Sequence, residues 1–218
     1  MNGEADTVLG DAAPGWFGKL PGMHDFAHRR LPVGFSEDWD NWLRTGLGRI
    51  RVGRQDQSER RLDAPRWCFV LGNGVVQTPS WIGVLIPSVP SDDAMGHFPF
   101  TLVTELLSSH AELTGEALAS VRQWWVLATR AVCQALEDKL DAVGFEVLLH
   151  QLFEGRAAPV ADDKGAVLAL PVVGQSLWFT DPTAEGGLGM ASQGLPQDDQ
   201  FEALFGGAGT AAPGAEDA

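Results

Sequence analysis

Three side chains that could bind a metal or transfer a proton lie close together near the start of the chain: His24, Asp25 and His28. Two histidines four residues apart share one face of a helix, which is a common arrangement for zinc ligands. Here, however, Pro21 precedes the trio and Pro32 follows it, which leaves little room for a stable helix. We therefore favour a turn in which the Asp25 carboxylate accepts hydrogen bonds from backbone N–H groups.

Gly18-Lys19 matches only the end of a phosphate-binding loop. Such a loop requires the pattern G-x-x-x-x-G-K-[ST] between a strand and a helix. In this chain Lys19 is followed by Leu20-Pro21, and the proline removes one of the amides that would bind phosphate. The sequence therefore does not predict a nucleotide site, and we expect no cofactor.

Ser88 follows an apolar run, where a catalytic serine could lie. A hydrolase elbow has the pattern G-x-S-x-G at a strand-to-helix turn, whereas Ser88 leads toward Pro90 in an expected loop. No set of nucleophile, base and orienting group can be assembled from the sequence. The main hypothesis is thus a binding protein without catalytic activity. The alternative is a metal-dependent or other hydrolase that uses His24, Asp25, His28 and His97.

An arginine-rich stretch at residues 49–61 differs from the rest of this acidic chain. It contains a glycine and lacks an apolar period, which indicates a loop. A solvated loop is the simpler interpretation, but arginine side chains also bind carboxylates and phosphates through paired hydrogen bonds. The candidate contacts for an acidic or phosphorylated partner are Arg51, Arg54, Arg60 and Arg61.

Apolar side chains lie on both sides of the longest expected helix, at residues 116–140. Its core-facing stripe has a spacing of three or four residues and comprises Leu118, Val121, Trp125, Ala128, Val132, Leu136 and Leu140. Trp124, Leu127 and Ala131 fall on the other side. They are either covered by the next helix or exposed as a patch that binds a partner.

Charge and composition exclude several classes of function. The 218 residues carry a formal net charge of −14, whereas a nucleic-acid binder must neutralise phosphates with lysine and arginine. The same charge disfavours an anionic membrane surface, and it can simply keep a protein in solution. Cys68 and Cys133 lie far apart in apolar stretches, and we expect both to be buried small hydrophobes.

Neither a secretory signal nor a membrane span is expected. Residues 1–13 lack a basic segment followed by an apolar one. No window approaches the run of about 18 apolar residues that a membrane-spanning helix needs. We therefore expect a cytoplasmic location.

Periodicity and turn signals predict the elements that position these residues. Helices are expected at residues 35–50, 116–140, 141–153 and 197–205. In the first helix, Ser36 is the expected N-cap, and Trp39, Trp42 and Leu43 lie on one face. Strands are expected at residues 16–21, 66–71, 81–86, 98–106, 175–180 and 188–193.

The order of these elements indicates the fold class. Three consecutive strands joined by short loops predict antiparallel pairing, so the class is α+β, with a mostly antiparallel sheet of about five strands and helices packed on it. Residues 15–205 are expected to form a single domain. Residues 1–14 and 206–218 are too polar, or too rich in glycine and alanine, to order themselves. The tryptophans expected to be buried in the strands are Trp67, Trp81 and Trp178.

Two segments contain unusual strings of residues in a fixed order. Residues 15–26 read G-W-F-G-K-L-P-G-M-H-D-F, and residues 81–89 and 96–102 read W-I-G-V-L-I-P-S-V and G-H-F-P-F-T-L. They resemble the motifs G-x-x-G-K-L-P-x-x-G-D-F, W-x-G-V-L-x-P-S-V-D and G-R-x-F-P-L-T-L of the TagF family, also called ImpM. Shorter matches occur at residues 64–67, 176–179 and 194–196. The family-motif residues, which we expect to be structural, are Gly18, Lys19, Pro21, Asp25, Phe26, Trp81, Gly83, Pro87, Ser88, Gly96, Phe98 and Pro99.

The resemblance implies a longin- or profilin-like sandwich and a role as an accessory protein that represses type VI secretion after translation. It also implies a partner, an FHA-domain scaffold protein of the secretion system. Three positions depart from the family pattern: His24 replaces Gly, Pro90 replaces Asp, and His97 lies near the expected Arg. If that Asp and Arg serve the family's function, this protein has a weakened or re-tuned version of it.

Overall fold

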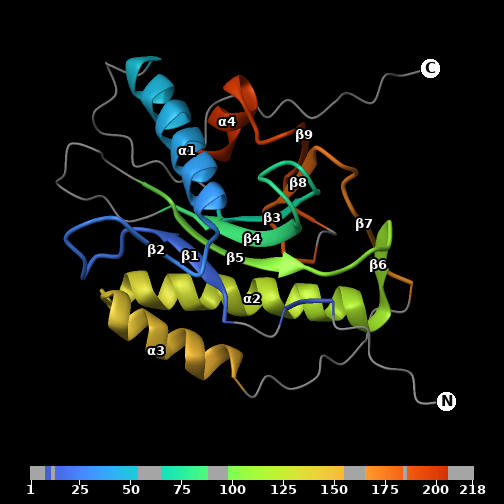
Figure 1. Cartoon of the computed structure of the whole chain (residues 1–218), viewed down its shortest axis with the longest axis horizontal. Coiled ribbons are helices and arrows are strands. Elements are labelled where there is room, and N and C mark those ends of the chain that lie inside the picture. The colour runs from blue at the N-terminus through green and yellow to red at the C-terminus, as the bar shows by residue number, and fades with distance from the viewer. Residues whose placement is uncertain are drawn as a thin grey trace.

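The computed structural model describes residues 8–10, 13–53, 65–87, 98–154, 165–183 and 186–205, with the backbone alone at residues 51–53. Within these residues the chain forms a seven-stranded antiparallel sheet with helices on both faces (Figure 1). The strand order is β2-β1-β5-β4-β3-β8-β9, and a separate small sheet pairs β6 with β7. The predicted α+β class and antiparallel pairing are confirmed, but the main sheet has seven strands where about five were expected.

The extra strands are the shortest ones. The strands are β1 (Gly15–Gly18), β2 (Ala27–Arg29), β3 (Trp67–Leu71), β4 (Ser80–Ile86), β5 (Phe100–Leu106), β6 (Glu112–Thr114), β7 (Val167–Ala169), β8 (Gln175–Phe179) and β9 (Gly189–Gln193). The helices are α1 (Val33–Gly53), α2 (Gly115–Glu137), α3 (Ala142–Phe153) and α4 (Asp198–Leu204). The unexpected strands β2, β6 and β7 have three residues each, too few for an alternating pattern to be recognised.

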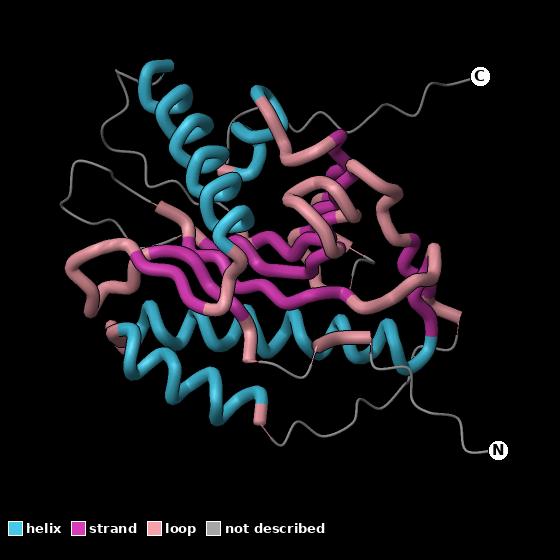
Figure 2. Tube along the Cα trace, in the orientation of Figure 1, coloured by secondary structure: helices cyan, strands magenta, loops and turns pink. Residues whose placement is uncertain are grey.

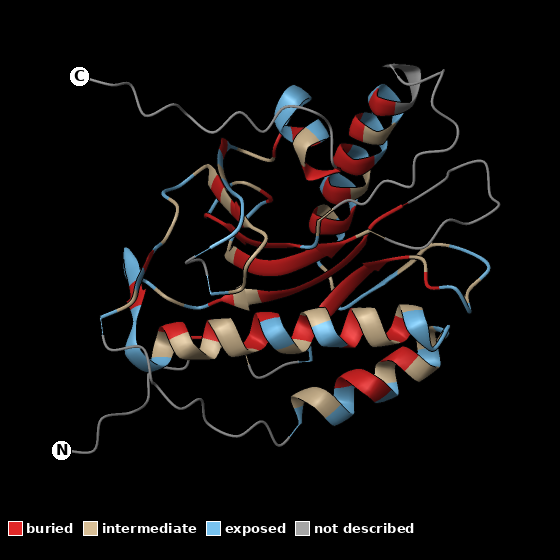
Figure 3. Ribbon diagram, turned by 180° about the vertical axis from the view of Figure 1, so that it is seen from behind, coloured by how far each residue is buried: buried red, intermediate tan, exposed pale blue. Residues whose placement is uncertain are grey.

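Different helices cover the two faces of the sheet. α2 and α3 lie on one face, and α1 and α4 lie on the other (Figure 1, Figure 2). Successive residues of β3 point into opposite layers, so Cys68 and Val70 pack with α2, whereas Trp67 and Phe69 pack with α1 and α4. Because both faces are covered, β3 and β4 are almost entirely buried (Figure 3).

Helix α1 extends further at both ends than its apolar pattern predicts. It begins at Val33, so the prediction of Ser36 as N-cap is wrong: its hydroxyl lies in the first turn and donates to the Val33 carbonyl at 2.8 Å. The helix also ends later, and Arg49 and Arg51 lie in it rather than in a loop. Arginine has a high helix propensity, and Arg49 also pairs with Asp198 of α4 at 2.7 Å.

An aromatic layer joins α1 to the sheet. The neighbouring rings are 4.6–6.4 Å apart between centroids and belong to Trp39, Trp42, Phe69 and Trp178. Rings at such distances contribute beyond the burial of their surface. The predicted burial of three tryptophans is confirmed, with exposed fractions of 3%, 4% and 0% for Trp67, Trp81 and Trp178.

Helices α2 and α3 pack on each other and on the opposite face of the sheet. The predicted stripe of α2 is confirmed at its centre, where Val121, Trp125 and Ala128 are fully buried. α3 begins after Asp141, whose carboxylate accepts a hydrogen bond from the Gly144 N–H at 2.8 Å. None of the helices in the described residues is long and apolar enough to cross a membrane.

The start of the chain is more ordered than its composition predicts. Val8 and Leu9 are buried, and the Leu107 N–H donates to the Val8 carbonyl at 2.9 Å, so the expected disorder of residues 1–14 does not include these two. They find partners because β5 extends beyond β1 on the edge that does not face β4: β1 pairs with β5 only as far as Val103, and Leu9 forms an isolated bridge with Leu106. The domain limits otherwise stay a prediction, and residues 206–218 lie outside the described residues.

The two cysteines differ in burial. Cys68 is buried in β3 as expected. Cys133, also expected to be buried, is only partly so, because it lies beside the buried stripe of α2 rather than on it.

Candidate functional site

The first family-motif segment forms a turn that is fixed against the connection between α2 and α3. After β1, the Met23 N–H donates to the Leu20 carbonyl at 3.0 Å, and the Gly22 N–H donates to the Leu140 carbonyl at 3.1 Å. A Cβ on Gly22 would lie 2.8 Å from the Leu140 carbonyl and from the Asp141 nitrogen. Glycine is thus required for this close approach, and the L-P-G string has a structural role here.

Two further motif glycines allow close packing in the sheet. Gly18 ends β1 with φ of +148°, and a Cβ there would lie 2.7 Å from the Phe100 ring. A Cβ on Gly83 would overlap the Phe69 ring. Both positions therefore support the expectation that these motif residues are structural.

The histidines near the start of the chain lie on two different local structures, a turn and a strand. His24 and Asp25 are exposed in the turn, and His28 lies in β2, where its ring stacks on Phe17 at 6.4 Å. His97 lies outside the described residues. Among those residues, no group of three or more His, Cys, Asp or Glu side chains is placed to hold a metal ion.

A surface cavity of about 270 Å³ lies where the first motif segment meets α1. We call it the motif groove. Strands β1 and β2 and the residue before β2 provide one wall, and the outer face of α1 provides the other. Its lining residues are Phe17, Phe26, Ala27, His28, Ser36, Glu37, Asp40 and Arg44.

The two family-motif segments converge at this groove through their phenylalanines. The ring of Phe26 meets the ring of Phe98 edge to face, with centroids 4.5 Å apart. Phe17 also contacts Phe98, at 6.0 Å. Phe98 is buried and Phe26 is only partly buried, so part of the Phe26 ring is accessible to solvent.

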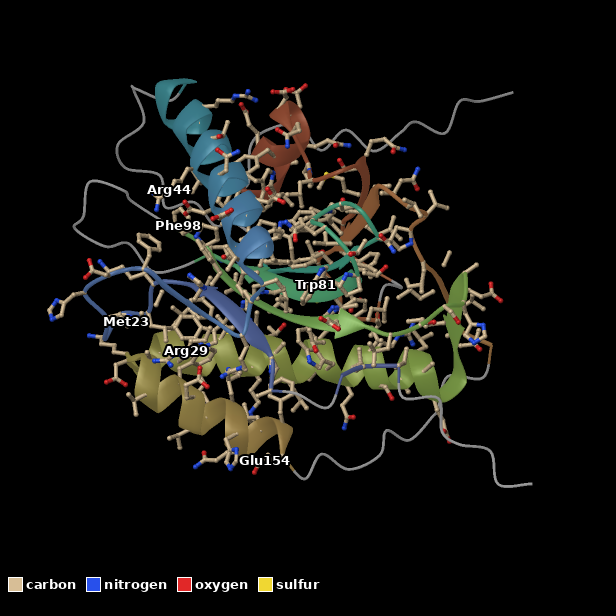
Figure 4. All side chains as sticks on the ribbon, in the orientation of Figure 1. Met23, Arg29, Arg44, Trp81, Phe98 and Glu154 are labelled. Carbon is tan, nitrogen blue, oxygen red and sulfur yellow. The ribbon has the colours of Figure 1, made fainter. Side chains whose placement is uncertain are left out.

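Arg44 closes the groove over these rings. Its guanidinium lies 5.9 Å from the centroids of both Phe26 and Phe98, and Figure 4 shows Arg44 and Phe98 next to each other. Its Nε donates to both carboxylate oxygens of Asp40, at 2.8 and 2.7 Å. Arg44 is thus held by a carboxylate and by two aromatic rings.

The polar wall of the groove was not among the candidate sites expected from the sequence. A signal was nevertheless present, because Glu37, Asp40 and Arg44 are spaced by three and four residues on a predicted helix. They lie on the face opposite the core-facing tryptophans. That spacing indicates a solvated ion-pair face as readily as a binding site.

A second polar cluster lies behind the groove and ties α3 to β1. Trp16 Nε1 donates to Glu146 Oε1 at 2.6 Å, and Arg30 Nη1 donates to Glu146 Oε2 at 2.7 Å. Arg30 takes a left-handed backbone conformation, with φ of +54°, and its Nε donates to the Pro14 carbonyl at 2.9 Å. Both oxygens of the Glu146 carboxylate therefore have hydrogen-bond partners, and they connect α3 with β1 and with the segment that follows β2.

The contacts of Glu146 also set its ionisation. Burial acts to raise the pKa of this carboxyl, but hydrogen bonds from Arg30 and Trp16 and the charges of Arg30 and Arg29 outweigh it. The net effect lowers the pKa from its usual value. A carboxylate that stays ionised in this way suits a structural ion pair rather than a general acid.

A second cavity, of about 370 Å³, lies between the end of the sheet and α4. Its lining residues are Gln175, Ala191, Ser192, Gln193, Gln197 and Gln200. None of these side chains ionises near neutral pH, so they do not provide a general acid or base. Of the two cavities, the motif groove is therefore the better candidate for a functional site.

The residues expected to bind a partner are only partly described. Trp124 is 2% exposed, and its ring lies 6.1 Å from the Phe153 ring of α3. Of the two interpretations of this side chain, coverage by the next helix is therefore the one that the structure supports. Leu127 is partly buried. The side chains of Arg51, Arg54, Arg60 and Arg61 lie outside the described residues.

The other family-motif residues are scattered around the sheet. Pro99 is buried, Lys19 and Pro87 are partly buried, and Pro21 is exposed. Ser88 and Gly96 lie outside the described residues, so their expected roles stay predictions.

Comparison with known proteins agrees with the motifs that meet at the groove. The model of the TagF N-terminal domain, which is type VI secretion system-associated, matches residues 15–152. The chain belongs to the TagF family. Within the matched range lie β1, β2, α1 and all eight residues of the motif groove.

A solved structure supports the fold of this TagF-family chain. The crystal structure of PA0076 from Pseudomonas aeruginosa PAO1 is similar to it with a TM-score of 0.66 and 24% sequence identity. The similarity covers 94% of this chain and 99% of PA0076. No match was found among curated proteins.

Proposed function

We propose that this protein is a non-enzymatic, cytoplasmic accessory protein that represses type VI secretion after translation by binding a partner. The proposed partner is an FHA-domain scaffold protein of the secretion system. The observation that carries the proposal is the match of the TagF N-terminal domain to residues 15–152. The motif groove is the proposed contact surface, because it places the family-motif residue Phe26 beside charged groups that are accessible to solvent.

The chemistry of the motif groove suits binding better than catalysis. Hydrolysis by a side chain requires a nucleophile within hydrogen-bond reach of a base. Ser36 provides the hydroxyl of the lining, and it donates to the Val33 carbonyl. Asp40 is paired with Arg44, and the ring of His28 stacks on Phe17. The lining therefore contributes surface and charge rather than an activated group.

The proposal predicts opposite effects of deletion and overproduction. Deleting the gene should raise export of the secreted tube protein, and overproducing the chain should lower it, because a binding repressor acts in proportion to its amount. Export is measured by immunoblotting culture supernatants. Unchanged export in both strains, with the apparatus shown to be expressed, would contradict the proposed function.

The hydrolase alternative built on His24, Asp25, His28 and His97 makes a different prediction. If the protein acts without catalysis, His24→Ala and Ser88→Ala variants that fold normally should repress export as well as the parent does. Metal analysis of the purified protein provides an independent check. Stoichiometric zinc or manganese, or loss of repression in either folded variant, would favour the hydrolase.

The arginines at positions 51, 54, 60 and 61 stay a proposed second docking patch for an acidic or phosphorylated group. The sequence predicts that these side chains are exposed, and substitutions at exposed positions usually change the free energy of unfolding by under about 0.5 kcal/mol. Changing all four to alanine should therefore weaken partner binding with little effect on stability, as measured by pull-down and thermal unfolding.

A further inference from the structure

The α1 wall of the motif groove carries more negative than positive charge. Glu37, Asp40 and Arg44 share one face of the helix. Asp40 is paired with Arg44, whereas Glu37 is exposed and has no ion-pair partner among the described residues. One carboxylate of the groove is thus available to a ligand.

The opposite wall of the groove is formed by Phe17, Phe26, Ala27 and His28, and it is apolar apart from the His28 ring, which stacks on Phe17. Phe26 and Ala27 are partly exposed there, and the Phe26 ring is supported by the buried Phe98 at 4.5 Å. Because Phe98 holds the ring in place, a ligand that packs on Phe26 need not order it. An apolar wall that faces a carboxylate suits a side chain with an aliphatic stem and a cationic head.

Arg44 shows that the groove can hold such a group. Its guanidinium lies 5.9 Å from the Phe26 centroid and is paired with the Asp40 carboxylate at 2.7 Å. Glu37 lies on the same face of α1, about one helical turn before Asp40, and faces the remaining part of the groove. The groove that Phe26 lines is therefore also lined by a second carboxylate.

We propose that the motif groove binds an arginine side chain of the partner protein, with the guanidinium at Glu37 and the aliphatic stem on Phe26 and Ala27. This inference rests on the proposed function, because the arginine is taken to belong to the partner. Arginine fits better than lysine, since a guanidinium is less strongly hydrated and stacks on aromatic rings. The net charge of −14 attracts a cationic surface from a distance and speeds encounter.

Peptide titration tests the chemistry of the groove without the partner. The full-length ¹⁵N-labelled chain is titrated with acetyl-Gly-Arg-Gly-amide and, separately, with the same peptide carrying citrulline, the neutral isostere of arginine. We expect the arginine peptide to shift the amide signals of Ala27, His28 and Asp40 saturably. The citrulline peptide should bind at least about tenfold more weakly, which corresponds to 1.4 kcal/mol.

Two matched variants locate the binding site on α1. Glu37→Gln should abolish the difference between the two peptides, whereas Asp38→Asn should keep it. Asp38 is also exposed, carries the same charge and is the next residue of the helix, but it does not line the groove. Equal binding of both peptides, no saturable shifts at the groove, or equal effects of the two substitutions would overturn the proposal.

Repression of export separates this inference from the proposed function. If both hold, Glu37→Lys should lose repression and Asp38→Lys should keep it. Failure of the parent chain to repress export would refute the proposed function, while the titration still decides what the groove binds. Repression by a Glu37→Lys variant at parental strength would refute the arginine contact alone.

Discussion

At the scale of single residues, indole hydrogen bonds fix the orientation of some buried tryptophans, whereas the N–H groups of Trp81 and Trp125 have no acceptor among the described residues. Trp39 Nε1 donates to the Thr101 hydroxyl at 2.9 Å, and Trp67 Nε1 donates to the Leu204 carbonyl at 2.9 Å. An indole N–H buried without an acceptor costs about 1–3 kcal/mol, so each bond selects one orientation of the ring. The apolar pattern predicts that these tryptophans are buried. It cannot predict their acceptors, which come from distant parts of the sequence.

Glu146 makes a pH-dependent contribution to stability. The pKa of its carboxyl is lowered in the folded protein, so folding favours the ionised form. This contribution is fully present above the pKa of the unfolded chain and is lost as the pH falls through the lower folded-state pKa. We expect Glu146→Gln to lower the free energy of unfolding by about 1 kcal/mol at pH 7, since the pair is partly solvated. The difference from the parent should shrink as the pH falls below about 4.3.

Urea unfolding of both proteins across this pH range measures the effect. Glu154→Gln is the matched control, because Glu154 follows the same helix and pairs with His150 but both side chains are about two-thirds exposed. The control should change stability by under about 0.5 kcal/mol at any pH. A constant difference between Glu146→Gln and the parent at all pH values would refute the structural ion pair.

At the scale of elements, a single glycine allows α4 to pack on α1. A Cβ on Gly46 would overlap the Phe201 ring, whereas a Cβ on Gly48 would meet nothing within 4 Å. We expect Gly46→Ala to destabilise the protein by about 1–3 kcal/mol through overpacking. Gly48→Ala should instead stabilise it by about 0.5–1 kcal/mol, since alanine is the better helix former.

Thermal and urea unfolding of these two variants test whether α4 is placed as described. Both substitutions add the same methyl group to the same helix. Opposite signs of the two changes in the free energy of unfolding would therefore report that Phe201 lies beside Gly46 and that Gly48 has no neighbour. Equal stabilisation by both would show that Phe201 does not pack on Gly46.

The elements that the sequence predicts best are those with a long apolar period. Helices α2 and α3 could be predicted because their apolar stripes repeat over several turns. The ends of α1 could not, since arginine and glycine residues obscure its last turns. Short strands such as β2 depend on a partner strand rather than on their own pattern.

At the scale of the whole molecule, tertiary pairing decides what the sequence leaves open. β1 pairs with β5, and β3 pairs with β8, across long stretches of chain, and no local signal specifies these partners. The motif groove depends on the same kind of placement. Phe26 and Phe98 could be singled out by their motifs, and the spacing of Glu37, Asp40 and Arg44 is visible in the sequence, but the meeting of the two at one groove could not be predicted.

The most direct measurement of the central claim is affinity purification of the tagged chain from a lysate of its native cells, with bound proteins quantified by mass spectrometry against an untagged strain. We predict that an FHA-domain scaffold protein of the type VI secretion system is enriched with the parent chain, and that rising salt in the wash reduces its enrichment because exposed charges are screened. Absence of enrichment in cells that demonstrably produce the scaffold protein would contradict the claim that this protein acts by binding it.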